Sequence, residues 1–322
     1  MKNYLNYHGN FKDLSKKDLE LLFIKLNDYR LKYHKNIGVD PNISFGVELE
    51  FQDVLLYYVK KELSRDVKFQ DWFIHEDKSC SYVVDDFAVG GEISSPILHD
   101  SDIDWKVLAE VIQCLKKLKA QVTDETAFQV HVGAQIFAQD IQNVVNFVKL
   151  WCIFEHVIFK FSYGNHSVAR SKILYFAHPI AEATQLKCQF IFNFLETLYC
   201  PKALNYDKKW ALNFQNYSFL SLEEEINNDI EIRCANGLLD KAMIQNTIYF
   251  YLKLMLYVMS DHFDQEYIDY LFQNLHVKNF EDYSKTYIED ALLLGDLIFD
   301  NSLDKINFLK QYIKKGEIVF VK

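Results

Sequence analysis

The chain has 322 residues, of which 50% are hydrophobic and 25% are charged, and its formal net charge is −10. This composition, with 10 Gly and 4 Pro, predicts a folded globular protein rather than a disordered one. The acidic balance argues against non-specific nucleic-acid binding. No apolar run reaches the length that spans a membrane and the first residues are polar, so we expect a soluble, cytosolic protein with no nucleic-acid or membrane partner.

Hydrophobic periodicity predicts the helices in chain order. We expect them at residues 12–35, 53–64, 102–119, 140–161, 181–198 and 241–260. The turn after Asn36, rich in Gly and Asn, is the expected end of the first helix. Beyond Ser260 the pattern is helical almost to the end of the chain, with turns near Asp261, Val277 and Gly316 and a short strand at 318–321.

Strands are predicted between these helices, where polar and apolar residues alternate. We expect them at residues 43–51, 127–136, 210–217 and 229–234. Residues 72–98 form further strands in this prediction, joined by turns at 77–79 and 85–86. Because long helical insertions separate the strands, we expect an α+β fold with a largely antiparallel sheet rather than a doubly wound one.

The cysteines lack the C-x-x-C spacing that is typical of zinc sites. They are Cys80, Cys114, Cys152, Cys188, Cys200 and Cys234. We expect reduced, packed thiols, which is the usual state in the cytosol.

Residues 45–51 place two carboxylates beside each other in one predicted strand. Successive side chains of a strand point to opposite faces, so Val47 and Leu49 would enter a core while Glu48 and Glu50 share the other face. Gly46 adds a position without a side chain next to them. Like charges this close repel each other, and a folded protein keeps such a pair most readily when a cation lies between them.

Five predicted strands have this polarity, with one apolar face and one face of functional side chains. The polar members are Glu48, Glu50, Glu92, Ser94, Gln129, His131, Asn213, Gln215, Glu231 and Arg233. Half-exposed antiparallel sheets commonly alternate in this way, which is the simpler interpretation. Here, however, the polar face collects four Glu, and Gly46 and Gly133 leave room for a ligand. If the strands pair in one sheet, the acidic groups converge on one cavity that Mg²⁺ would neutralise.

These motifs, in this order, resemble those of the amidoligases, ATP-dependent carboxylate-amine ligases of the glutamine synthetase and glutamate-cysteine ligase superfamily. The resemblance spans roughly residues 43 to 250. It rests on Phe45-Gly46-Val47-Glu48-Leu49-Glu50-Phe51, Asp77-Lys78-Ser79, Gly91-Glu92-Ile93-Ser94-Ser95-Pro96-Ile97-Leu98, Gln129-Val130-His131-Val132-Gly133, Asn213 and Ile230-Glu231-Ile232-Arg233. It implies a glutamine synthetase-like catalytic domain over residues 1–260, with the helix at 12–35 packed on it, and a helical C-terminal extension over 261–322.

The resemblance also implies the roles of the site residues. Metal ligands would be Glu48, Glu50, Glu92 and Glu231, and nucleotide contacts would be Gln129, His131, Asn213 and Arg233. The implied cofactors are ATP and Mg²⁺, or Mn²⁺ in place of Mg²⁺. One departure is clear: the family's first His of a His-x-His-x-Gly strand is Gln129 here, although a Gln carbonyl can still coordinate Mg²⁺.

The chemistry of amide formation requires the same kinds of groups. A carboxylate needs a better leaving group, which an acyl phosphate made from ATP provides, and phosphoryl transfer needs metal-bound carboxylates and an arginine on the phosphate. Arg233 and Arg170, the latter in a loop after the helix at 140–161, are the expected catalytic arginines.

Simpler roles exist for several of these residues. Glu92 and Glu231 could form salt bridges, His131 could be a hydrogen-bonded buried histidine, and Arg233 could pair with Glu231. Asn213 could make a strand-end hydrogen bond, and Asp77 with Ser79 is first of all a turn. Glu155, on the helix after the histidine strand, is a weak candidate.

Three functions are therefore open. The first is an ATP- and Mg²⁺-dependent ligase that joins a carboxylate to an amine, with an amino acid, a small peptide or a protein side chain as substrate. The second is a non-catalytic interaction module that keeps the ligase fold. The third is a metal-dependent phosphohydrolase or phosphotransferase. The sequence does not decide the oligomeric state.

Overall fold

The computed structural model describes residues 2–5, 7–138, 140–181, 209–217, 228–315 and 317. The helix expected at 181–198 lies outside the described residues beyond Ala181. So do the turn at Gly316, the strand at 318–321 and two of the cysteines, Cys188 and Cys200. The other four cysteines are buried thiols. None of the described helices is long and apolar enough to cross a membrane.

The strands form one sheet in which neighbouring strands pair antiparallel and the strand order differs from the order in the sequence. They are β1 (Ser44–Leu55), β2 (Phe73–His75), β3 (Tyr82–Val84), β4 (Phe87–Ser94), β5 (Leu98–His99), β6 (Ala127–Gly133), β7 (Leu212–Asn213) and β8 (Asp229–Asn236). Their order is β2-β4-β1-β6-β8-β7, with β3 paired to β4 and β5 paired to β1. This arrangement confirms the expected α+β fold with a largely antiparallel sheet.

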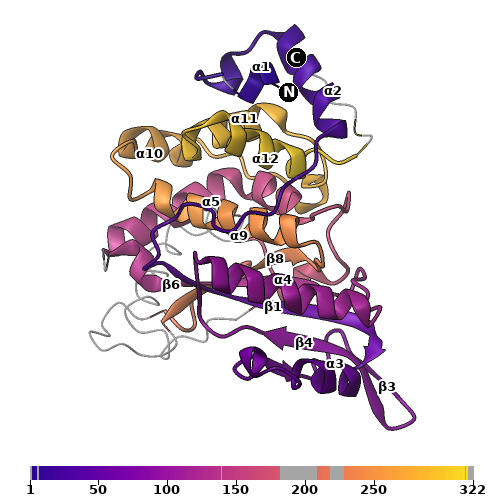
Figure 1. Ribbon diagram of the computed structural model, residues 1–322. Helices are drawn as coiled ribbons and strands as arrows, with labels where there is room; N and C mark the ends of the chain where they lie inside the picture. The colour runs from indigo at the N-terminus through magenta and orange to yellow at the C-terminus, as the bar shows by residue number, and fades with distance from the viewer. Residues whose placement is uncertain are drawn as a thin grey trace.

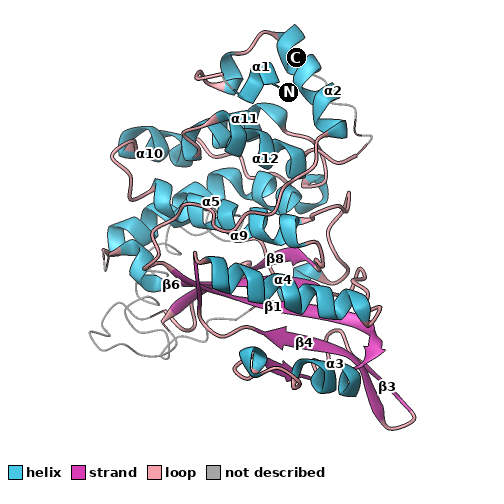
Figure 2. Ribbon diagram, viewed as in Figure 1, coloured by secondary structure: helices cyan, strands magenta, loops and turns pink. Residues whose placement is uncertain are grey.

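Helices cover one face of the sheet and stack above it in layers (Figure 1). The longer ones are α2 (Lys16–Asp28), α3 (Leu56–Leu63), α4 (Asp102–Lys117), α5 (Ile141–Ser162), α9 (Lys241–Tyr257), α10 (Gln265–Gln273), α11 (Ile288–Ile298) and α12 (Ser302–Tyr312). The short ones are α1 (Lys2–Leu5), α6 (Ile173–Phe176), η1 (Phe11–Asp13), η2 (Val67–Phe69), η3 (Ala134–Phe137) and η4 (Phe280–Asp282). Figure 2 shows the strands gathered in one half of the molecule together with α3 and α4, and most of the other helices in the other half.

The apolar face of the central strand explains why the helices lie where they do. Val47, Leu49 and Phe51 of β1 are almost fully buried, and Phe45 packs on Trp105 of α4 with ring centroids 5.2 Å apart. Burial of large apolar side chains contributes about 1.5–3 kcal/mol each. The helices therefore cover the face of β1 that carries Val47, Leu49 and Phe51 and leave the opposite face uncovered.

The helix predicted at 12–35 is wrong in its length. After η1, the helix α2 ends at Asp28, and Tyr29 has extended backbone angles. The next residues cross α9 as an extended segment, in which the His34 N–H donates to Gln245 (2.7 Å) and the backbone N–H groups of Ile37, Gly38 and Val39 donate to Asp100. Hydrogen bonds to distant residues thus replace the last helical turns, which periodicity alone cannot reveal.

Strand boundaries also differ from the prediction. Strand β1 continues to Leu55, where helix α3 begins, and β6 ends at Gly133 because residues 134–137 form a 3₁₀ turn. Strand β7 has only two residues because the Asn213 side chain accepts the Gln215 N–H (3.0 Å) and turns the chain. Gln215 therefore does not extend the polar face, contrary to the prediction.

The turn predicted at Asp85 and Asp86 is confirmed as a two-residue hairpin. Val84 pairs with Phe87, and the two residues between them have φ values of 48° and 68°. Two positive φ angles are what the favoured type I′ hairpin turn requires, and Asp tolerates them better than most residues.

Candidate functional site

Three rows of side chains run across the face of the sheet that the helices leave open. The first row is His75, Glu92 and Glu50; the second is Phe73, Ser94, Glu48 and Gln129; the third is Gly46, His131, Glu231 and Asn213. Residues directly opposite each other on antiparallel strands share a face. We call this surface the site face. It carries all four glutamates that the sequence predicts as metal ligands.

The first acidic cluster consists of Glu50, Asp77 and Glu92. One carboxylate oxygen of each lies within 4.8 Å of the others, and Glu50 and Glu92 are each 4% exposed. Asp77 comes from the predicted turn, which is present: the Cys80 N–H donates to the Asp77 carbonyl (3.2 Å) and the Ser79 N–H to its carboxylate (2.6 Å). The turn therefore brings a third carboxylate to the site face.

Burial holds protons on this cluster. It raises the pKa of Glu50 to about 7, although the charge of Arg170 and a hydrogen bond from the Ala127 N–H (2.7 Å) oppose the rise. Burial, together with repulsion by Glu48 and Glu50, raises the pKa of Glu92 to about 8. Near neutral pH the cluster is therefore partly protonated, and a divalent cation would displace those protons.

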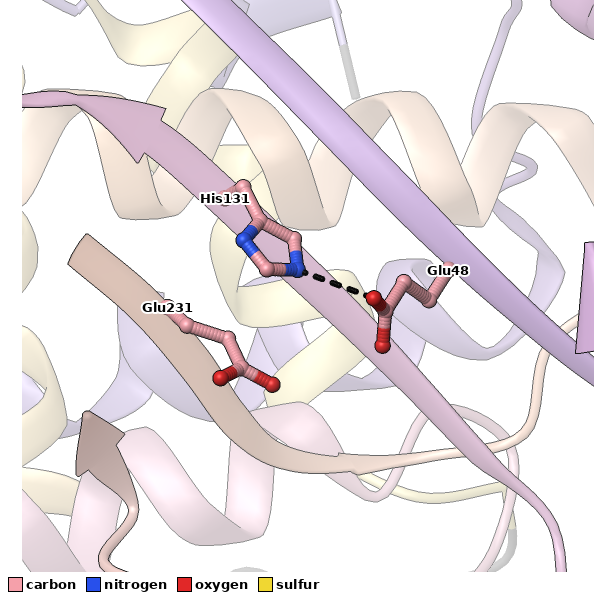
Figure 3. Close-up of side chains that lie close together, drawn as sticks. All are labelled: Glu48, His131 and Glu231. Carbon is pink, nitrogen blue, oxygen red and sulfur yellow. Dashed lines mark ion pairs between the residues drawn. The ribbon is translucent and has the colours of Figure 1, made fainter. Parts of the chain in front are cut away.

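The second cluster consists of Glu48, His131 and Glu231, which come from three adjacent strands and point into a common space (Figure 3). The His131 Nε2 atom lies 3.3 Å from Glu48 Oε1, and its Nδ1 atom lies 3.3 Å from Asp229 Oδ2. Burial alone would lower the pKa of His131. The hydrogen bond to Asp229, the nearby carboxylate of Glu48 and the charge of Glu231 outweigh this and raise it to about 10. Without a metal, His131 is therefore a cation between carboxylates.

Glu231 has partners on both of its oxygens. Arg233 Nη1 pairs with Oε1, and Asn213 Nδ2 donates to Oε2 (2.6 Å). Arg233 Nε donates to the Phe176 carbonyl (3.2 Å). The structure thus contains the ion pair between Arg233 and Glu231 and the hydrogen bond of Asn213, which are the simpler roles considered for these residues.

Residues 41–255 match the protein family described as "Putative amidoligase enzyme". The chain belongs to this amidoligase family. A search of curated proteins found no match. The match covers both clusters and every strand of the sheet, so the amidoligase assignment applies to the part of the chain that carries the site face.

At the position where the amidoligase departs from the family pattern, Gln129 bridges the two clusters. Its Nε2 atom donates to Glu50 Oε1 (3.4 Å), and it stands opposite Glu48 in the sheet. Its Oε1 atom is buried and has no hydrogen-bond partner among the described residues. A buried carbonyl oxygen without a partner is costly. The amide is thus oriented with its carbonyl oxygen available to a ligand.

Arg170 is a buried arginine of the amidoligase whose charge acts on Glu50 of the first cluster. Its backbone N–H donates to Asn236 (2.8 Å) and its Nη2 to the Arg233 carbonyl (3.4 Å). It is 5% exposed, and its Nε has no partner within the described part of the chain. Burial lowers its pKa while the charge of Glu50 opposes that change. The loop that carries Arg170 is where the sequence predicts it, and it brings a buried positive charge to the acidic groups.

A pocket of about 230 Å³ opens beside the second cluster. Glu48, His131 and Asp229 line one part of it, and Ser95 and Ile97 line another. A Cβ atom at Gly46 would lie 3.6 Å from both His131 and Ser95. The pocket of the amidoligase thus reaches the acidic groups directly, and it is large enough for a small substrate group.

Two residues of the site, Asp229 and His75, are not among the predicted site residues, and a third, Asp77, is predicted mainly as part of a turn. Asp229 contacts His131, and the available signal is its position two residues before Glu231 in the same strand. His75 Nε2 lies 3.4 Å from Glu92. The available signal is alternation, because His75 and Phe73 are two residues apart and so share one face of the strand. Asp77 was predicted as a turn, and nothing in the turn pattern indicates where its carboxylate points.

Glu155 is a structural residue of the amidoligase. It is 1% exposed, and it accepts hydrogen bonds from the Ile180 and Ala181 N–H groups (2.7 and 2.9 Å), from Trp151 (3.0 Å) and from the Tyr283 hydroxyl (3.0 Å). Four donors therefore converge on one carboxylate that is not part of either cluster.

We expect the change Glu155→Ala to lower the free energy of unfolding by about 3 kcal/mol, because it leaves buried donors unpaired. Urea denaturation followed by circular dichroism measures the effect. Glu155→Gln keeps an acceptor oxygen and should cost less. An unchanged urea midpoint for Glu155→Ala would contradict the structural role.

Proposed function

We propose that this amidoligase is an ATP- and Mg²⁺-dependent carboxylate-amine ligase that forms an amide through an acyl phosphate. The observation that carries the proposal is the presence of two carboxylate clusters side by side on one sheet face of a chain in an amidoligase family. We further propose a glutamine synthetase-like catalytic domain over residues 1–260 and a helical extension over 261–322. The substrates would be a carboxylate and an amine of an amino acid, a small peptide or a protein side chain.

The donor atoms fit the proposed metal. Mg²⁺ prefers oxygen ligands and keeps several waters. Glu50, Asp77 and Glu92 offer only oxygen atoms, and the Gln129 amide contacts Glu50 through Nε2, while its buried Oε1 has no partner among the described residues. The second cluster mixes carboxylates with an imidazole, a donor set that Mn²⁺ accepts as well. His131 must lose a proton before it can serve as a ligand.

Bound Mg²⁺ would neutralise the triphosphate and stabilise the charge that develops during phosphoryl transfer. Glu50 and Glu92 would hold it in the first cluster, and Glu48 and Glu231 in the second. Among the described residues, the Arg233 guanidinium uses N–H donors for Glu231 and Phe176 only, and a guanidinium has five. The remaining donors can bind the transferred phosphate, while Arg170 supplies a buried positive charge near Glu50.

The test is to incubate the protein with ATP, Mg²⁺ and pooled amino acids, and to follow ADP. ADP release that requires both a carboxylate and an amine supports the ligase. Phosphate release without either supports a phosphohydrolase, and absence of nucleotide binding supports a non-catalytic interaction module.

We expect Glu48→Ala and Arg233→Ala to lower ADP release by at least about a hundred-fold, because the first removes a proposed metal ligand and the second removes a positive charge that would face the transferred phosphate. Both proteins should remain folded in circular dichroism. Glu266→Ala and Arg65→Ala, at exposed positions away from the site face, are the matched controls. A large loss of thermal stability in both site variants would instead indicate structural roles.

A further inference from the structure

Phe73 is the one large apolar side chain in the three rows of the site face. Its neighbours across the sheet are Ser94, Glu48 and Gln129. Its side of the sheet is established by register, because Phe73 lies opposite Ser94 on β4 and Ser94 lies opposite Glu48 on β1. An aromatic ring on an otherwise polar, acidic surface needs a specific explanation.

The ring of Phe73 is exposed on one side and supported on the other. Phe73 is 64% exposed. The ring stacks on the imidazole of His75, with centroids 4.8 Å apart and planes inclined by 28°. His75 in turn lies 3.4 Å from Glu92 of the first cluster. The stack therefore forms a flat apolar surface that begins where the acidic cluster ends.

We infer that Phe73, supported by His75, is the surface on which the purine base of the nucleotide stacks. The inference rests on the proposed function, since it assumes that the acidic clusters hold a metal-bound triphosphate. A nucleotide has one charged end and one planar aromatic end. The site face offers matching surfaces for both, in adjacent rows of the same sheet.

The spacing agrees with this assignment. Phe73 and His75 are two residues apart on β2, which corresponds to about 7 Å along a strand. Because His75 covers one face of the ring, the base would stack on the other face, and the ribose and phosphates would pass His75 to reach a metal held by Glu92. Stacking on an aromatic ring needs no hydrogen bonds to the base, which suits a position at the open edge of the sheet.

Binding measurements that separate the base from the phosphates test the inference. Isothermal titration calorimetry would measure Kd for Mg·ATP and for Mg·tripolyphosphate, which lacks the base and the ribose. We expect Phe73→Ala to raise Kd for Mg·ATP by about five- to a hundred-fold, the range for loss of one stacked base. Kd for Mg·tripolyphosphate should stay within about two-fold.

Two further variants complete the design. Phe73→Trp keeps an aromatic surface, so it should retain Mg·ATP binding, and its fluorescence should change when ATP binds. Phe87→Ala removes another exposed phenylalanine, on the hairpin of β3 and β4, and should leave both affinities unchanged. Circular dichroism checks that each variant is folded.

The outcomes separate this inference from the proposed function. If the wild type binds neither Mg·ATP nor Mg·tripolyphosphate, the proposed function fails and the inference fails with it. If the wild type binds Mg·ATP and Phe73→Ala leaves its Kd unchanged, or weakens both ligands equally, only the stacking role is overturned.

Discussion

Replacing Glu92 by Gln is expected to abolish turnover and to raise the thermal stability of the metal-free protein above pH 8. The loss of turnover follows from removal of a metal ligand, and we expect at least about a thousand-fold. The gain in stability follows from the pKa of Glu92, which burial and the charges of Glu48 and Glu50 raise to about 8. Above that pH the folded protein carries a buried carboxylate that Gln removes.

The combination of effects distinguishes a functional residue from a structural one. If Glu92 served mainly to hold the fold through Ser94 Oγ, which donates to it at 3.0 Å, the variant would be less stable at every pH. Differential scanning fluorimetry at pH 6 and pH 9, with ADP release measured in parallel, checks both effects. The change Glu289→Gln, at an exposed position on α11, is the control. A variant that is both active and less stable would contradict the assignment.

The face of the sheet could be predicted from the sequence because alternation determines it. Once Val47 and Leu49 enter the core, Glu48 and Glu50 must share the opposite face, and the same rule applies to Glu231. The register that puts Glu50 opposite Glu92, rather than one residue away, depends on hydrogen bonding between distant segments. The structure supplies that register, and a slip of one residue would have turned one of the glutamates into the core.

The site residues that the sequence did not reveal lie at the ends of elements. Asp77 is in a turn, so alternation does not constrain its side chain. Asp229 begins β8 two residues before Glu231, so alternation places it on the same face, but a position at a strand end gives little reason to single it out. The same limit explains the first helix. Its last predicted turns, after Asp28, are replaced by hydrogen bonds to Asp100 and Gln245, which are far away in the chain.

The stability of the metal-free protein is expected to fall as the pH rises, and Mg²⁺ is expected to reverse the fall. Glu50 and Glu92 have pKa values raised to about 7 and about 8, so the folded state holds their protons more tightly than the unfolded state. Their contribution is therefore lost from about pH 5 to pH 8. His131, whose pKa is raised to about 10, contributes below about pH 6.5 and loses that contribution as the pH approaches 10. All three pKa values are raised, so all three contributions to stability decrease as the pH rises.

Mg²⁺ binds the deprotonated forms, so its affinity should rise by roughly ten-fold or more per pH unit between pH 6 and pH 7. At a fixed excess of Mg²⁺, the increase in Tm should be small at pH 6 and large at pH 8.5, since stabilisation grows with the ratio of metal concentration to Kd. Calorimetry in buffers of different ionisation enthalpy would count the protons released. The double change Glu50→Gln with Glu92→Gln should remove the metal effect at both pH values. A Tm increase of equal size at pH 6 and pH 8.5 would show that the cation binds elsewhere, because only buried, protonated ligands couple metal binding to proton release in this way.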